Sequence, residues 1–464
     1  MSSEPNPSKN KIRNIVILIG SIVVGTFLVY YFCNPKPQFF YDYTFRVADN
    51  FLHGAIGFKE KPPSWLNEFV PFENNWYSVF PLGSVLTMLP FALFKFFGLI
   101  NGMPSAFISA LTASLVCLFL LLIAREYDYG WNKRILMTLG ILFGTWMWTN
   151  ESMASAWQLA LGFAMVGELG AIYFTVFKPR PLLAGAFFAL AFGNRTEVLL
   201  IAPIFMFLLA QNDFNRRGVN IPEEAESDVV NSNFEEHAFK KQVSPKFKNS
   251  LSFRRRLNGL INLFLRRWKT LALFCAVPFV LGVLTLIYNY IRFHSPTDFG
   301  YERIPGVLDE PWYNHGIFSL YYIPGQAFEM LWKPWEIKNK FPYLVPNVFS
   351  SSILWSSPFI LLALRFGARE KILKYASWAA IFILTFLLWM HGNSGGGQFG
   401  YRYAMVLLPW IFLILLENSP KKITLLEGFL YVFSILVNAY SVYLFHWSGD
   451  IKLIVEIFHR SNLL

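Results

Sequence analysis

The sequence predicts an all-α polytopic membrane protein with about 11 transmembrane segments, some of them short or re-entrant. Hydrophobic residues make up 55% of the 464 residues and charged residues only 15%, whereas about a quarter of the residues in soluble domains are charged. Aromatic residues reach 18%, more than a soluble fold of this length could easily bury. The basic residues cluster between apolar segments, as in cytoplasmic loops, so the net charge of +11 does not indicate a nucleic-acid partner.

The apolar segments begin close to the amino terminus. Residues 15–32 follow Lys9, Lys11 and Arg13 and are long enough to cross a hydrocarbon core of roughly 30 Å. We therefore expect the amino end to be cytoplasmic. Further apolar runs cover residues 79–98, 105–124, 135–150, 155–177, 182–210, 270–291, 349–364, 375–390, 404–416 and 424–446.

A long polar loop divides the chain into two membrane modules. Residues 1–210 form the first module, 269–464 the second, and 211–268 a loop whose second half is basic. Its charge predicts a cytoplasmic loop. Apolar residues at helical spacing within 257–264 fit a helix on an anionic leaflet, or a soluble linker helix.

The predicted cytoplasmic loop sets the sidedness of its neighbours. Residues 34–78, 292–348 and 391–403 are then expected to be extracytoplasmic. Simple alternation in the first half would also place Arg125, Lys133 and Arg134 outside, against the positive-inside rule. One segment must therefore be half-length or re-entrant. Polar residues 193–197 interrupt the run 182–210, which favours a hairpin with Arg195 near the outer surface.

The first outside loop contains a charged pattern. As a helix, this stretch would place Asp42, Arg46 and Asp49 on one face and Phe45, Ala48 and Leu52 on another. It would lie along the membrane and present two carboxylates and a guanidinium. The other interpretation is an amphipathic helix with solvated salt bridges only.

Two later outside loops also carry candidate binding residues. Residues 392–403 form a glycine-rich stretch with Gln398, Arg402 and Tyr403; its backbone amides and Arg402 can bind a phosphate, or it is a flexible turn. After the run ending near residue 291 come Tyr301 and Glu302, followed by several exposed-loop aromatics. These can stack on sugar rings or form an interfacial aromatic belt.

These motifs resemble the GT-C membrane glycosyltransferases, in particular the protein-mannosyltransferase and aminoarabinose-transferase branch. The pattern Asp42, Arg46, Ala48, Gly54 looks like that family's first extracytoplasmic loop. Residues 77–90 are similar to the proline-bearing entry of its second span, and residues 399–403 to a motif in bacterial members. The resemblance runs loosely along the whole chain, and only the first motif is reasonably specific.

The resemblance implies sugar transfer from a polyprenyl-phosphate donor to a glycan, lipid or protein acceptor outside the membrane. It assigns Asp42 as the base, with Asp49 as a rival. The family's donor-binding lysine is missing here, because Phe80, Pro81 and Leu82 replace Lys-Pro-Pro. Arg46, Arg195 or Arg402 would then bind the donor phosphate.

Further candidates are less clearly placed. Glu151 is a second acid for substrate binding, or a helix cap. His315 and His391 form no metal triad in the sequence. The resembled family has metal-dependent and metal-independent members, so a divalent cation stays open as a cofactor.

Two other functions remain open. A transporter or flippase would also need buried charges, but should show an internal repeat; a lipid-linked glycan polymerase or ligase would use one large late loop, for which 292–348 is long enough. No organellar or retention signal is visible, which favours a bacterial inner membrane.

Overall fold

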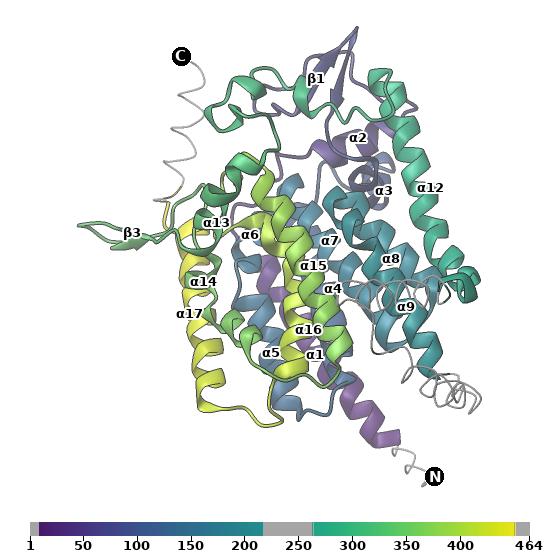
Figure 1. Ribbon diagram of the computed structural model, residues 1–464. Coiled ribbons are helices and arrows are strands. Elements are labelled where there is room, and N and C mark those ends of the chain that lie inside the picture. The colour runs from purple at the N-terminus through teal and green to yellow at the C-terminus, as the bar shows by residue number, and fades with distance from the viewer. Residues whose placement is uncertain (1–8, 217–261, 263, 450, 452–464) are drawn as a thin grey trace, which may run out of the picture.

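The protein is a bundle of helices. The computed structural model describes residues 9–216, 262, 264–449 and 451. Within them, six helices are long and apolar enough to cross a membrane, and Figure 1 shows them running along the bundle with shorter helices between them. They are α1 (Lys9–Phe32), α4 (Ser105–Arg125), α7 (Ala156–Ile172) with its π-helical extension η1 (Tyr173–Phe177), α12 (Trp268–Phe293), α15 (Lys371–Met390) and α17 (Leu425–His446). The predicted class, an all-α membrane protein, is therefore confirmed.

Helix α7 lies at the centre of the bundle, and α1 and α12 lie at its edge. In its apolar window 83% of the residues of α7 are buried, against 11% in α1 and in α12. A Cβ on Gly167 would lie 2.5 Å from the backbone nitrogen of Ala191, so α7 and α8 (Pro181–Asn194) pack backbone to backbone. The outer helices expose apolar side chains such as Val16 and Phe279, as contact with lipid requires.

The first loop folds at one end of the bundle, which we call the loop end. It contains α2 (Tyr43–Leu52) and the strands β1 (Phe69–Phe72) and β2 (Asn75–Ser78), and α3 (Leu82–Phe96) follows it. The strands pair antiparallel, with Phe69 opposite Ser78. Helix α3 runs along α2, because Leu82 shares a groove with Phe51 while Lys95 pairs with Asp49. Both ends of α3 thus lie beside α2, and α3 does not cross the bundle.

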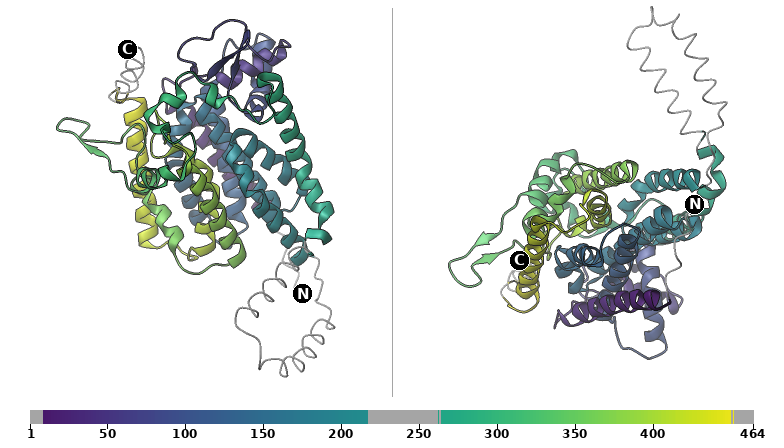
Figure 2. Two further views of the ribbon diagram at one scale, coloured as in Figure 1. Left: turned by 45° about the horizontal axis from the view of Figure 1, so that its top comes forward. Right: turned by 90° about the horizontal axis from the view of Figure 1, so that it is seen from below.

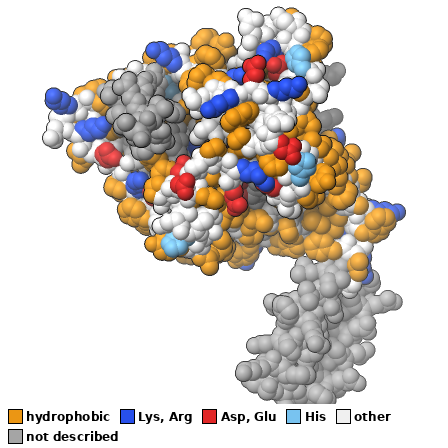
Figure 3. Space-filling view, turned by 90° about the horizontal axis from the view of Figure 1, so that it is seen from above, with side chains coloured by type: hydrophobic (Ala, Val, Ile, Leu, Met, Phe, Trp, Pro, Cys, Tyr) orange, Lys and Arg blue, Asp and Glu red, His pale blue; other side chains and the backbone are white. Residues whose placement is uncertain are grey.

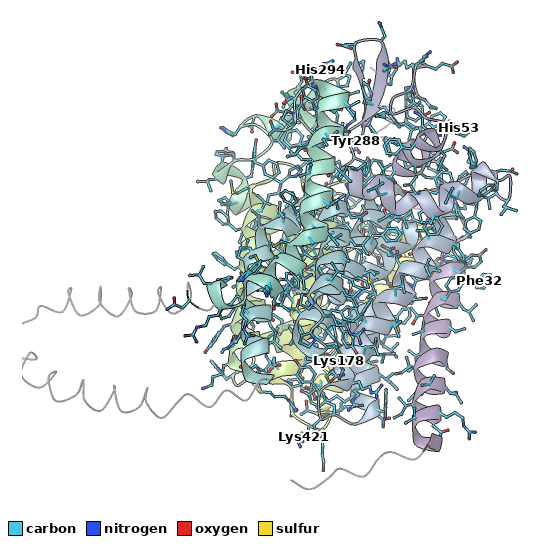
Figure 4. All side chains as sticks on the ribbon, turned by 90° about the vertical axis from the view of Figure 1, so that its right-hand side faces the viewer. Phe32, His53, Lys178, Tyr288, His294 and Lys421 are labelled. Carbon is cyan, nitrogen blue, oxygen red and sulfur yellow. The ribbon has the colours of Figure 1, made fainter. Side chains whose placement is uncertain are left out.

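Basic residues gather at the opposite end, the basic end. Lys133 pairs with Glu427 at 3.2 Å, Lys178 with Glu126 at 3.3 Å, and Lys421 with Asp128. Figure 4 shows Lys178 and Lys421 at this end and His53 and His294 at the other. Because α3 stays at the loop end, α4 begins there and delivers Arg125 to the basic end. Simple alternation had placed Arg125, Lys133 and Arg134 outside the membrane. Helix α3, which does not cross, removes this conflict with the positive-inside rule, and the run 182–210 is interrupted as well.

Several predicted apolar runs are broken into short helices. The run 182–210 becomes α8, the 3₁₀-helix η2 (Thr196–Ile201) and α9 (Ala202–Arg216), with the break at Arg195. Three further runs are divided between α5 (Trp131–Phe143) and α6 (Met147–Met153), between α14 (Ile353–Ser356) and η7 (Pro358–Leu364), and between η8 (Arg402–Leu407) and α16 (Leu408–Asn418). Each described piece is shorter than the ~20 residues of a straight crossing, so eleven spans are not confirmed.

The loop after α12 carries many short elements. They are η3 (Tyr301–Arg303), η4 (Val307–Asp309), η5 (Pro311–Tyr313), η6 (Leu320–Tyr322), α13 (Ile323–Leu331), β3 (Glu336–Ile337) and β4 (Leu344–Val345). The predicted surface helix within 257–264 falls almost wholly outside the described residues.

Candidate functional site

Polar and aromatic side chains from six segments meet at the loop end. They come from the loop before β1, the first turn of α7, the break after α8, the loop after α12, the end of α15 and the start of η8. Figure 3 shows acidic and basic side chains gathered on this end, with hydrophobic side chains around them. We call the group the arginine–tyrosine cluster: Glu68, Trp157, Arg195, Glu197, Tyr301, Tyr313, His391, Arg402 and Tyr403.

Arg402 is the most buried cation of the cluster, with 7% of its surface exposed. Its guanidinium donates to the carbonyl of Gly396 at 3.0 Å and to the hydroxyl of Tyr403 at 3.2 Å. Its buried Nε has no hydrogen-bond partner, and no ion pair involves Arg402 within the described chain. A guanidinium has five N–H donors, so Arg402 retains capacity to bind an anion.

The glycine-rich loop holds Arg402 in place. Gln398 accepts from the backbone nitrogen of Arg402 at 2.7 Å and donates to the carbonyl of Ser394 at 2.6 Å. Gly400 adopts φ +67°, and a Cβ there would lie 2.8 Å from that of Trp146. The side-chain amide of Gln398, which was predicted to bind substrate, thus forms its hydrogen bonds within the loop. Gly400 permits a backbone conformation with positive φ that other residues adopt only at a cost in free energy.

Arg195 joins Arg402 through the ring of Tyr403. The two guanidinium carbons lie 4.8 Å and 5.1 Å from the ring centroid. Arg195 also pairs with Glu197 at 2.6 Å. Helix α8 ends at Asn194, and the following break turns Arg195 into the cluster. The structure therefore brings Arg195, from the interrupted run 182–210, together with Arg402 and Tyr403 of the glycine-rich stretch 392–403.

Glu68 is a second carboxyl group of the cluster, and the ring of Trp157 links it to Arg402. The indole Nε1 of Trp157 donates to both of its oxygens, at 2.8 and 2.9 Å, and the same indole lies 5.8 Å from the Arg402 guanidinium. Burial raises the pKa of Glu68 from 4.5 to about 7, although Trp157 and Arg402 act to lower it. Near neutral pH this carboxyl can therefore accept or donate a proton.

Three rings form one wall of the cluster. The hydroxyls of Tyr301 and Tyr313 lie 3.0 Å apart, and Tyr313 lies 3.4 Å from Nε2 of His391. Nδ1 of His391 lies 2.6 Å from the carbonyl of Asn393, which can only accept, so Nδ1 carries the proton. Burial lowers the pKa of His391, and Nε2 is then an acceptor for Tyr313.

Helix α2 presents the charged face that its spacing predicts. The two oxygens of Asp42 bind Arg46 at 3.0 Å, and Asp49 pairs with Lys95 of α3 at 2.6 Å. Burial raises the pKa of Asp42, opposed chiefly by Arg46. The second oxygen of Asp49 is buried without a partner. Positive and negative side chains thus alternate on this face of α2. Lys95 belongs to the group but was not predicted from the sequence.

Aromatic rings separate the α2 face from the arginine–tyrosine cluster. Tyr41 and Tyr43, on either side of Asp42, contact the ring of Trp157 with centroids 5.0 and 5.2 Å apart. Trp157 in turn holds Glu68. Asp42 itself faces Arg46, so its carboxylate and that of Glu68 belong to neighbouring but different groups.

The remaining predicted residues lie elsewhere. Glu151 is fully buried in α6, where Thr112 donates to it and Gly162 packs against it. Glu302 is exposed in η3, beside Tyr301. The structure does not bring either carboxylate into the hydrogen bonds of the cluster, and their predicted roles in substrate binding remain predictions.

Sequence reasoning missed Glu68 and Trp157 as site residues, whereas Tyr313 was among the loop aromatics expected to stack on sugar rings or to form an interfacial belt. Glu68 lies in an irregular loop where no periodicity assigns a face, and Trp157 opens a helix whose apolar residues lie on every side. The available signal was a carboxylate within the predicted first outside loop.

No group of three or more His, Cys, Asp or Glu among the described residues could hold a metal ion. The divalent cation used by some members of the resembled family therefore finds no ligand cluster in this part of the chain. Comparison of the chain with protein families, curated proteins and solved structures found no match.

Proposed function

We propose that this chain is an integral membrane glycosyltransferase of the GT-C type, moving a sugar from a polyprenyl-phosphate donor to an extracytoplasmic acceptor. Arg402 carries the proposal. Its guanidinium is buried, lacks an ion-pair partner in the described chain and keeps an unpartnered Nε. A buried charge without a counter-ion is costly, and an anionic ligand offsets that cost. Phosphate matches the planar fork of a guanidinium.

The chemistry of the proposed reaction suits the residues of the cluster. The acceptor hydroxyl oxygen bonds to the anomeric carbon of the sugar while the bond from that carbon to the phosphate oxygen breaks. The hydroxyl proton passes to a carboxylate, and polyprenyl phosphate leaves. Arg402 and Arg195 stabilise the leaving phosphate, and Tyr301 and Tyr403 offer rings against which a sugar can stack.

Three carboxylates compete for the role of base. The resemblance implies Asp42, with Asp49 as a rival, but Arg46 engages both oxygens of Asp42 and Lys95 pairs with Asp49 at 2.6 Å. Glu68 has a pKa of about 7 and shares an indole with Arg402. A base works best when its pKa lies near the working pH, so we assign Glu68 as the base and Asp42 as a positioning residue.

One helix of the first loop supports the GT-C proposal: α2, expected to lie along the membrane, lies at the loop end. Helix α3 departs from the resemblance, because residues 77–90 resemble the entry of a second span whereas α3 stays beside α2. The charge distribution supports the sidedness. Arg125, Lys133, Lys178 and Lys421 share the basic end, which the positive-inside rule assigns to the cytoplasm. The cluster would then face the outside of a bacterial inner membrane.

Release of polyprenyl phosphate tests the activity. Purified protein in liposomes receives a panel of polyprenyl-phosphate sugars and a glycolipid extract as acceptor, and mass spectrometry measures the lipid products. The wild type should consume one donor, and Arg402→Ala and Glu68→Gln should not. Arg180→Ala, which alters an exposed arginine at the basic end, is the matched control and should remain active. If the wild type consumes none of the donors while it binds them, a flippase becomes the better interpretation.

A further inference from the structure

A short apolar hairpin extends from the bundle near the loop end. Strands β3 and β4 pair antiparallel with Ile337 opposite Leu344, so these two side chains share a face. Ile337 is 85% exposed, Phe341 64% and Tyr343 63%. Figure 1 and the view from below in Figure 2 both show the hairpin reaching sideways, away from the helices. A soluble surface rarely exposes such side chains together.

The base of the hairpin is attached to a candidate membrane span. The hydroxyl of Tyr440 donates to the carbonyl of Leu344 at 3.0 Å, and its ring stacks on Trp335 with centroids 6.2 Å apart. Tyr440 lies within the last two turns of α17, which ends at His446. The hairpin therefore leaves the bundle at the level where a spanning helix passes from hydrocarbon to head groups.

The composition of the hairpin suits that level. Lys338 and Lys340 lie between Ile337 and Phe341 in the sequence of the hairpin, and both are exposed. Trp447, directly after α17, and Trp332, directly after α13, are 57% and 61% exposed. Tyrosine and tryptophan concentrate at membrane–water interfaces, and lysines there contact anionic lipid phosphates.

We propose that the hairpin, residues 336–345, inserts its apolar face into the head-group region of the bilayer and anchors the loop end to the membrane surface. Its sideways direction keeps it in the plane of the membrane, at the depth fixed by Tyr440. This role is independent of the sugar transfer proposed above. A protein partner covering the same side chains is the competing outcome.

Site-specific photocrosslinking in the membranes of expressing cells distinguishes the two. The photoreactive amino acid p-benzoylphenylalanine replaces Phe341 in the full-length protein. The same photoreactive amino acid at Phe279, which is 71% exposed on α12, serves as the lipid-facing reference. At Leu308, which is 50% exposed in η4, it serves as the control outside the lipid. After irradiation, mass spectrometry of the peptides reads the mass added at each position.

The expected result is a shift by the mass of one phospholipid at 341 and at 279, with none at 308. A protein adduct at 341, or no lipid adduct at 341 while 279 gives one, would overturn the proposal. Each variant must also retain the thermal stability of the wild type in the same membranes, which shows that the substituted hairpin leaves the fold intact.

Discussion

Arg402 is the residue on which the proposed binding of a phosphate depends. Arg402 is held by the backbone of Gly396 and by Tyr403, and its Nε is unpartnered. Removing one donor that stabilises a transition-state charge costs about 3 kcal/mol, or roughly 10²-fold to 10³-fold in rate. We predict such a loss in kcat/KM for Arg402→Gln. Arg402→Lys should recover only part of it, because lysine keeps the charge but not the fork. Equal rates for wild type and Arg402→Gln would contradict this role.

Glu68 should set the pH dependence of transfer. Its carboxyl must be ionised to accept a proton, and its pKa is raised to about 7. Below that pH the group is mainly protonated, so kcat/KM should rise about tenfold per pH unit and level off above it. Glu68→Gln should remove this limb together with most of the activity. Initial rates at several pH values measure both, and a limb that persists in Glu68→Gln would assign the base elsewhere.

Asp42 provides the comparison. If it positions α2 through Arg46, Asp42→Asn lowers the rate but leaves the pH limb unchanged, because the titrating group is still present. Rates of Asp42→Asn over the same pH range test this. Loss of the limb in Asp42→Asn alone would return the role of base to Asp42, as the family resemblance implies.

At the scale of elements, the contact between α3 and α8 depends on two glycines. A Cβ added to Gly83 would lie 2.3 Å from the Cα of Gly193, so the helices approach through bare backbone. Gly83→Ala should push α3 away at a cost of about 1–3 kcal/mol, seen as a lower Tm. Gly282→Ala on α12 is the matched control, because its Cβ would meet nothing within 4 Å. Equal Tm values for the two variants would refute the close packing.

The sequence predicts elements unevenly, for physical reasons. The four- and seven-residue spacing of Asp42, Arg46 and Asp49 predicted the charged face of α2 correctly, because a helix fixes which residues share a face. The run 79–98 gave no such guidance. It is long and apolar enough to suggest a span, and tertiary contacts such as the pair of Lys95 with Asp49 show that α3 ends beside α2.

The arginine–tyrosine cluster was also predicted only in part from the sequence. Arg195, Arg402 and Tyr403 stood out individually as charged or aromatic residues near the outer edge of the bilayer, but their meeting around one ring depends on how the break after α8 packs against η8. Glu68 and Trp157 carried no spacing signal. Their roles follow from a hydrogen bond between segments 89 residues apart, which local patterns do not encode.

At the scale of the whole molecule, the two ends should lie on opposite sides of the membrane. A protease recognition sequence inserted at 420–421, at the basic end, should be cut only in inside-out vesicles, since basic residues stay in the cytoplasm. The same sequence inserted at 305–306, near the loop end, should be cut only in right-side-out vesicles. Cleavage of both sites in one orientation would reject the arrangement of the bundle in the membrane.

The most direct test of the account is native mass spectrometry of the protein released gently from its own membranes. Wild type and Glu68→Gln should both carry a polyprenyl phosphate or its sugar conjugate, because the phosphate contacts remain, and the mass would identify the donor. Arg402→Gln should lose it, while Arg180→Ala keeps it. Absence of an isoprenoid phosphate from the wild type, or its full retention by Arg402→Gln, would contradict the claim that the buried arginine binds a lipid phosphate.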